Sequence, residues 1–232
     1  VDDKRFATRR SMREAVDAHF SAIEQTDALE GMDTFYQRAY SLISSEKARE
    51  AFDIEKESVK LRDEYGRNTA GARMLLARRL VQAGVRMVNL TYGGWDMHSG
   101  IVNGFKNQMP QFDQAFAAVV EDLAARSMLD NVLVIAMSEF GRTPRINGHI
   151  GRDHWPEAWS VGMAGCGLKK GLAVGKTNAQ GTYVDGDAHD IGHLFHTWFR
   201  ALGIDPKKTE YDNHGQPLPI AHDDCSPVGE LL

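Results

Sequence analysis

The chain has 232 residues, of which 42% are hydrophobic and 25% charged, and its formal net charge is -5. This balance is typical of a globular protein, and the mixing of both charge signs along the chain argues against a nucleic-acid-binding protein, which needs clustered Lys and Arg. No apolar run approaches the roughly 20 residues that a membrane-spanning helix needs, so we expect no membrane span.

The first 83 residues are rich in charge, contain no proline and show helical spacing of their apolar residues. They predict two to four helices, the last of which stops at Gly84. We expect residues 1–84 to form a helical segment that packs on an α/β core of residues 85–232. The two parts are predicted to make one structural domain.

Two β-branched apolar runs, residues 85–92 and 132–137, predict buried strands. Pro110 is expected to open a helix between them, which gives a strand, helix, strand unit with a parallel crossover. Residues 159–164 predict a third strand, and a final amphipathic helix ends at Gly203. The predicted fold is therefore α/β, with a mainly parallel sheet flanked by helices.

Three polar motifs lie at or near the ends of these strands, where open α/β folds place their active sites. They are residues 93–98, 138–144 and 151–155. In the first motif, Asp96 and His98 offer oxygen and nitrogen ligands within one tight loop, and such a pair can bind one divalent metal. The alternative is an aspartate that caps a turn beside an exposed histidine.

The other two motifs supply further charged and metal-capable side chains. Glu139 follows a predicted buried strand, and an ionised carboxylate there needs a metal or Arg142 to offset its desolvation. It is therefore either a metal ligand or one partner of a structural ion pair with Arg142. His154 is a third candidate metal ligand. Asp153 is either a ligand itself or the partner that orients a histidine ligand. The alternative is that both residues belong to a hydrogen-bonded loop. Arg142 and Arg152 can clamp a phosphate or sulfate or be surface arginines.

Histidines and cysteines elsewhere in the chain are weaker candidates. His189, His193 and His196 have a spacing that can bind metal, but they lie opposite the apolar stripe, so we expect a solvated helix face. Cys166 and Cys225 are far apart and lack metal-ligand spacing. A single disulfide between them stays open.

Six motifs occur in order along the chain: Ala77-Arg78-Arg79-Leu80, Gly84-Val85-Arg86, Gly94-Trp95-Asp96-Met97-His98, Glu139-Phe140-Gly141-Arg142-Thr143-Pro144, Gly151-Arg152-Asp153-His154 and Leu202-Gly203-Ile204-Asp205. Together they resemble the bacterial domain-of-unknown-function 1501 family, a branch of the alkaline phosphatase and sulfatase superfamily. The resemblance implies an alkaline phosphatase-like sandwich with a metal centre above its sheet. Asp96, His98 and His154 look like the counterparts of the ligands of one metal.

The chain departs from the superfamily pattern in two ways. An Asp-His pair that binds a second metal is replaced here by Glu139-Phe140, and Phe140 cannot bind metal. The first strand of family members, which carries an acidic ligand and the nucleophile, is not found, so the nucleophile is not identified. We therefore expect the chain to be the carboxyl-terminal part of a member, with the missing strand on an upstream segment or a partner chain. Family members often carry a twin-arginine export signal, which implies a periplasmic or extracytoplasmic location.

The first hypothesis for the function is a sulfatase- or phosphatase-like, metal-dependent hydrolase domain for phosphate or sulfate esters, inactive as isolated if its nucleophile lies elsewhere. The substrate would be a small-molecule or polymer ester, and the expected metal is zinc, with calcium or manganese as alternatives. The competing hypothesis is a noncatalytic binding or scaffold module that keeps the fold and one metal. In a third hypothesis, the three loops that carry the polar motifs are only structural and bind no metal.

Overall fold

The computed structural model of the chain describes residues 4, 7–12, 14, 35–37, 50–208 and 210–232. The chain divides into two compact units, residues 1–53 and 54–232. The described stretches of the first unit are almost entirely helical, and in them Arg10 forms an ion pair with Glu14 at 2.9 Å. Two to four helices were predicted over the first 83 residues, and most of that stretch before residue 50 lies outside the described residues.

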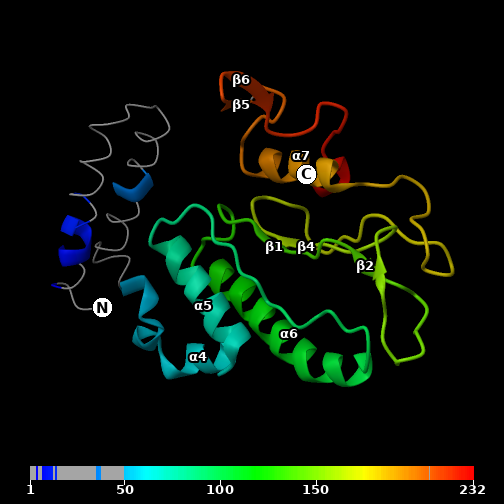
Figure 1. The fold of residues 1–232 in the computed structure, drawn as a ribbon, viewed down its shortest axis with the longest axis horizontal. Helices are drawn as coiled ribbons and strands as arrows, with labels where there is room; N and C mark the ends of the chain where they lie inside the picture. The colour runs from blue at the N-terminus through cyan, green and yellow to red at the C-terminus, as the bar shows by residue number, and fades with distance from the viewer. Residues whose placement is uncertain (1–3, 5–6, 13, 15–34, 38–49, 209) are drawn as a thin grey trace. The chain divides into compact units, whose positions relative to one another are not determined.

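Three helices of the second unit pack against one another through a shared apolar core (Figure 1). After the short 3-10 helix η1 (Ile54–Lys56) come α4 (Val59–Tyr65), α5 (Thr69–Gln82) and α6 (Ile101–Ala125). The fully buried members of this core are Tyr65, Leu75, Ala118, Val119 and Leu123. The side chains of Ser58 and Asn68 accept hydrogen bonds from the first turns of α4 and α5, which explains where these two helices begin.

Helix α6 begins earlier than predicted, because Pro110 lies inside it rather than at its start. A proline in a helix interior removes one backbone hydrogen bond and is expected to break or kink the helix. Here the Trp95 ring contacts Phe105 before the proline and Phe112 after it, with ring centroids 5.8 and 6.0 Å apart. These aromatic contacts hold both halves of the helix against one side chain, and tertiary packing of this kind overrides local propensity.

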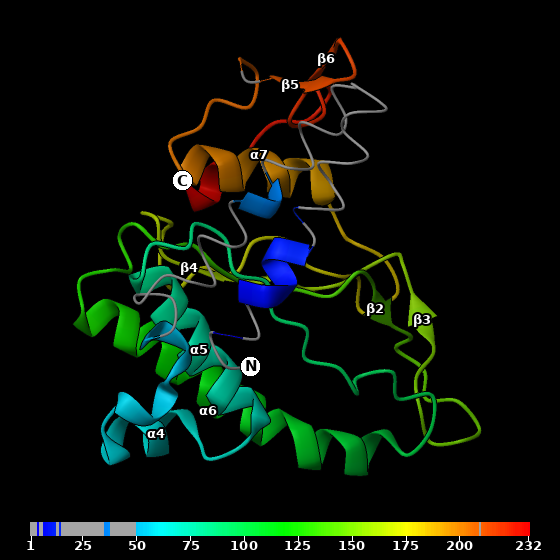
Figure 2. The same ribbon diagram turned by 60° about the vertical axis from the view of Figure 1, so that its left-hand side comes forward.

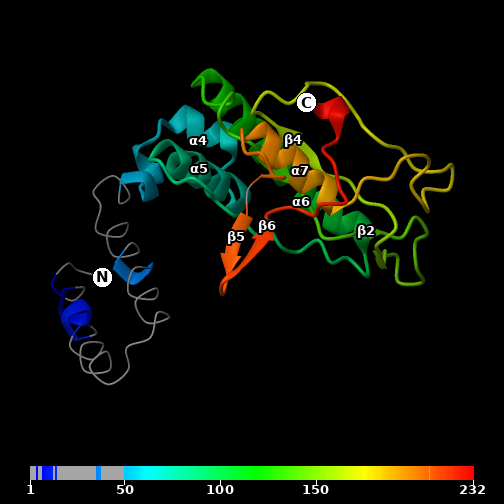
Figure 3. The same ribbon diagram turned by 90° about the horizontal axis from the view of Figure 1, so that it is seen from above.

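In the described part of the chain, the strands form three separate two-stranded antiparallel sheets. The pairs are β1 (Val134–Ala136) with β4 (Gly162–Ala164), β2 (Gly141–Arg142) with β3 (His154–Trp155), and β5 (Glu210–Asn213) with β6 (Gln216–Pro219). The second of these pairs lies apart from the first, and the third projects as a separate hairpin (Figures 2 and 3).

The predicted mainly parallel sheet is therefore not observed among the described residues, although the α/β class is confirmed. The prediction depended on residues 85–92 as the first strand, but this stretch has no assigned strand, and Met87 within it is 82% exposed. A parallel crossover needs two strands in one sheet. Because the first is missing, β1 pairs instead with the later strand β4, in the register Val134↔Ala164.

The β1–β4 ribbon has helices on both sides. On one side Val134 packs against the core of α4, α5 and α6. On the other lies α7 (Ile191–Ala201), whose Trp198 indole donates a hydrogen bond to the sulfur of Met163 in β4 at 3.0 Å. The short 3-10 helix η2 (Gly229–Leu231) ends the chain. None of the described helices combines the length and the apolarity that crossing a bilayer requires.

Candidate metal centre

The loop of the first motif turns alternate side chains in opposite directions. Trp95 packs among aromatic rings, and Met97 is buried against α6, where a side chain at Gly104 would collide with its sulfur. The intervening residues Asp96 and His98 are exposed. The two apolar residues therefore anchor the loop, and their packing turns the polar residues away from the core.

The β2–β3 ribbon brings the other two motifs to this loop. Its register places Arg142 opposite His154. The backbone amide of Arg152 donates to the Met97 carbonyl at 3.0 Å, and the side-chain amide of Asn147 donates to the His98 carbonyl at 3.1 Å. One backbone and one side-chain hydrogen bond thus join segments that are about 50 residues apart in the sequence.

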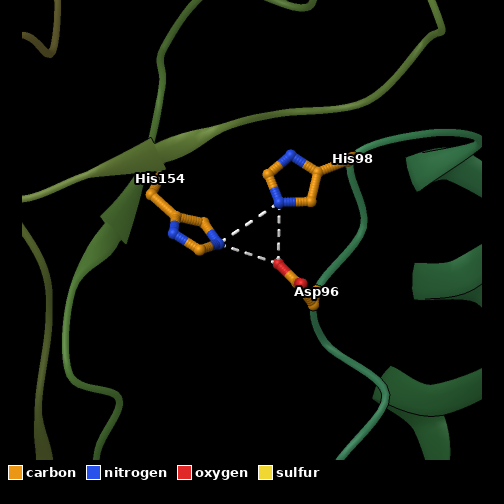
Figure 4. Close-up of side chains that lie close together, drawn as sticks. All are labelled: Asp96, His98 and His154. Carbon is orange, nitrogen blue, oxygen red and sulfur yellow. Dashed lines mark hydrogen bonds and ion pairs between the residues drawn. The ribbon is translucent and has the colours of Figure 1, made fainter.

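Asp96, His98 and His154 converge so that one ligand atom of each faces the other two (Figure 4). Oδ1 of Asp96 lies 3.0 Å from Nε2 of His98 and 2.9 Å from Nε2 of His154, and the two Nε2 atoms are 3.2 Å apart. Ligands about 2.0–2.2 Å from a tetrahedral metal lie about 3.3–3.6 Å from each other. The three atoms therefore need to move apart by only a few tenths of an ångström to admit an ion.

Asp153 lies behind His98 rather than among the three converging ligands. Its Oδ1 is 2.7 Å from Nδ1 of His98 and also accepts a hydrogen bond from the Asn147 side chain at 3.1 Å. A carboxylate on the far nitrogen fixes the ring and directs the other nitrogen at a metal. Of the two roles open for Asp153 in the sequence, its position suits the orienting one.

Of Arg142, Arg152 and Glu139, only Arg142 contacts one of the three converging ligand residues in the described structure. Nη2 of Arg142 lies 2.5 Å from Oδ1 of Asp96, so this arginine pairs with Asp96 and not with Glu139. Glu139 is exposed and lies outside the three-ligand group. The guanidinium of Arg152 donates to the Thr143 carbonyl at 3.0 Å, which ties it to the backbone of β2 and its following residues.

Phe140 packs on the imidazole of His154, with ring centroids 4.1 Å apart, and the guanidinium of Arg142 lies 5.7 Å from the centre of the Phe140 ring. An aromatic ring in this place holds the His154 ring in position but offers no ligand atom. Among the described residues, the cluster therefore offers three ligand atoms that could hold one metal.

The hydrogen bond with His154, followed by the one with Arg142, lowers the pKa of Asp96 to about 2. The hydrogen bond with His98 lowers the pKa of Asp153 from its ordinary value. Both carboxylates are therefore ionised at neutral pH, and their negative charge favours a cation between the two imidazoles.

Replacing His154 with alanine is expected to raise the pKa of Asp96 from about 2 toward 3.8, because the largest cause of the lowering is removed. The carboxyl carbon can be titrated by NMR in the metal-free protein. Ionised Asp96 stabilises the folded state above about pH 4, and this contribution is lost as the pH falls toward 2. His149→Ala is the control, because it removes an exposed imidazole outside the cluster and keeps both hydrogen bonds. A carboxyl that titrates near 3.8 in the unmodified protein contradicts the observed geometry.

Gly151 lies where the two site loops meet, and it is buried. A Cβ atom there would overlap the His98 carbonyl and the Ser99 amide, whereas a Cβ atom at Gly148 would meet nothing within 4 Å. We expect Gly151→Ala to lower the free energy of unfolding by about 1–3 kcal/mol and to weaken zinc binding, because the loops must separate. Gly148→Ala should change neither quantity. Urea unfolding and zinc titration of both variants test this, and equal behaviour of the two contradicts it.

Asn147 is a site residue that the sequence prediction missed. Its side-chain oxygen accepts hydrogen bonds from the amides of His149 and Gly151, both at 3.0 Å, while its nitrogen donates to the His98 loop and to Asp153. The available signal was the Asn147-Gly148 dipeptide, a frequent turn former. That signal predicts the turn but not the contact with Asp153.

The prediction that His189, His193 and His196 form a solvated helix face is wrong for His196. That side chain is 1% exposed, and its Nε2 is 2.7 Å from the His222 carbonyl. His193 is partly buried and pairs with Asp190, at the start of α7. Cys166 and Cys225 are both free thiols, so the disulfide left open by the sequence is not formed.

Comparison with known proteins adds one finding. The family model described as "Protein of unknown function (DUF1501)" matches residues 1–232, which include all three site motifs. No curated protein and no solved structure matched the chain.

Proposed function

The chain belongs to the DUF1501 family, and we propose that its Asp96, His98 and His154 cluster binds one divalent metal and serves a metal-dependent hydrolase domain of the alkaline phosphatase and sulfatase type. Its substrates would be phosphate or sulfate esters, and it would act outside the cytoplasm. The observation that carries the proposal is the convergence of one carboxylate and two imidazoles at mutual distances of 2.9–3.2 Å. Shared architecture does not by itself carry shared chemistry, so the argument rests on this site.

The donor set suits zinc better than calcium. Two imidazole nitrogens and one carboxylate oxygen match the three-ligand sites in which zinc keeps a fourth position open. Calcium prefers six to eight oxygen ligands, which these side chains do not offer. A metal in this place would supply a Lewis acid that polarises an ester oxygen and lowers the pKa of bound water.

The residues around the cluster have separate parts in this proposal. Asp153 keeps the His98 ring oriented through its 2.7 Å contact with Nδ1. Arg142 already lies beside Asp96, and its guanidinium would stabilise a phosphate or sulfate oxygen next to the metal. All three ligand residues are exposed, so a substrate could approach them from solvent. We assign no nucleophile within the chain.

The test is hydrolysis of para-nitrophenyl phosphate and para-nitrophenyl sulfate by the zinc-loaded full-length protein that contains this chain. We expect turnover that depends on metal, is abolished by His154→Ala and is retained by His149→Ala, which removes an exposed imidazole outside the cluster. Turnover that survives His154→Ala contradicts the proposal. Metal binding without any turnover also contradicts it.

The second candidate function is a noncatalytic binding module that retains one metal. Phe140 favours it, because the ring fills the face of His154 where the superfamily pattern has a residue that binds a second metal. A single exposed metal with Arg142 beside it can bind an anionic group without cleaving it. Retention of phosphate or sulfate groups by the metal-loaded protein, without release of nitrophenol, is the result that supports this function.

A further inference from the structure

A second group of metal-capable side chains lies at the start of α7, on different elements from the first. Asp190 is the N-cap residue of this helix, His193 lies in its first turn, and Cys225 comes from the segment that follows β6. One ligand atom of each residue lies within 4.8 Å of the others. We propose that Asp190, His193 and Cys225 form a second metal site, selective for a thiophilic divalent cation such as zinc, that fastens the carboxyl-terminal segment to α7.

The distances are close to those that a bound ion needs. The sulfur of Cys225 lies 3.8 Å from Oδ1 of Asp190, and Nδ1 of His193 lies 2.8 Å from the same oxygen. Sulfur and oxygen ligands of a tetrahedral zinc are about 3.5–3.7 Å apart, and nitrogen and oxygen ligands about 3.3 Å. Of these two contacts, the one between Asp190 and His193 has to open by about half an ångström, and the Cys225 sulfur lies within 4.8 Å of the His193 ligand atom.

The Cys225 thiol is held against the helix by contacts on both sides of it in the sequence. The buried side chain of His196 is 2.7 Å from the His222 carbonyl, and the amide of Val228 donates to the hydroxyl of Thr197 at 2.9 Å. Gly192 makes room for the sulfur, because a Cβ atom there would lie 2.5 Å from it. The fold therefore places this thiol beside Asp190 rather than leaving it on a free tail.

His189 adds a second sign of a ligand. Its Nδ1 atom is buried and has no hydrogen-bond partner within the described part of the chain, and its ring centroid is 5.5 Å from that of His193. A buried imidazole nitrogen without a partner is costly. His189 lies outside the three-residue group but beside His193, so it marks an unsatisfied polar atom next to the proposed ion.

Asp190 and His193 also cap the amino terminus of α7. Asp190 accepts the His193 amide at 3.2 Å, and His193 contacts the Asp190 amide at 3.3 Å. A cap explains these two residues but not the thiol beside them. A metal in this place would bind Cys225 as the thiolate.

Cobalt titration of the reduced full-length protein tests the proposal. Cobalt bound to a thiolate gives near-ultraviolet charge-transfer absorption, and the Asp96, His98 and His154 cluster contains no sulfur, so the band reports only the second site. We expect the band in the unmodified protein and in Cys166→Ser, and its loss in Cys225→Ser. Zinc should abolish the band by displacing cobalt.

Asp190→Asn is the second variant, because asparagine also caps helices and keeps α7 intact. We expect it to weaken cobalt binding at least about tenfold, as loss of a carboxylate ligand would. No band in the unmodified protein, or a band that survives Cys225→Ser, overturns the proposal. His154→Ala should leave the band unchanged, so failure of this site and failure of the proposed hydrolase site are distinguishable.

Discussion

Replacing Arg78 with alanine is expected to lower the free energy of unfolding by about 3–5 kcal/mol. Arg78 lies in α5 and is 1% exposed, and its guanidinium is 2.8 Å from the carboxylate of Glu57 and 2.7 Å from that of Asp122. Nη1 of Arg78 also donates a hydrogen bond to the Gln82 side chain at 2.6 Å, and Tyr65 donates one to Asp122 at 3.0 Å. Alanine would remove the most deeply buried cation of this network, which is the costly way to break it. Glu57 would keep its ion pair with Arg79 and Asp122 its ion pair with Arg126, so we expect a loss in the lower part of this range.

Arg73→Ala is the matched control, because Arg73 lies on the same helix but is exposed. It donates one hydrogen bond to the Thr91 carbonyl at 2.7 Å, so its loss should cost less than about 1 kcal/mol. Urea unfolding followed by tryptophan fluorescence suits both variants, since all four tryptophans lie in residues 54–232. If Arg78→Ala is no less stable than Arg73→Ala, the buried network does not stabilise the helices as described.

Replacing His98 with alanine is expected to weaken zinc binding at the Asp96 cluster by more than about 100-fold. Loss of an orienting partner alone typically costs about 10–100-fold, and this change removes a ligand and also leaves Asp153 without its histidine. Calorimetric titration in a Cys225→Ser background isolates this cluster from the second group of ligands.

His149→Ala is the control for His98→Ala. It removes an exposed imidazole from the loop next to the cluster without touching the three ligands. We expect zinc affinity to stay within about twofold of the unmodified protein, as for a surface substitution. Equal losses in both variants would mean that the loop, and not the imidazole of His98, determines binding.

The helices were predictable from the sequence because their signals are local. Apolar spacing and a following glycine place α5 and α7 close to their observed ends. Pro110 was misleading, since the contacts of Trp95 that hold α6 together come from outside the helix. Residues 85–92 have the composition of a strand, but composition does not say whether a pairing partner exists.

The three ligands of the candidate site were predictable, but the route that brings them together was not. The sequence suggested the carboxyl ends of parallel strands, whereas the antiparallel β2–β3 ribbon delivers His154. The contact of Arg142 with Asp96 follows from that ribbon's register and has no signature in the spacing of the motifs. Cys225 is 35 residues from Asp190, so only the packing of the last segment on α7 could reveal that pair.

Anomalous diffraction from a crystal grown with zinc tests the central claim most directly. We expect a peak at the zinc edge bounded by Oδ1 of Asp96 and the Nε2 atoms of His98 and His154, at about 2.0–2.2 Å from each. A second peak beside Cys225 would be compatible with this result. No peak between Asp96, His98 and His154 at saturating zinc would contradict the assignment of these residues as a metal site.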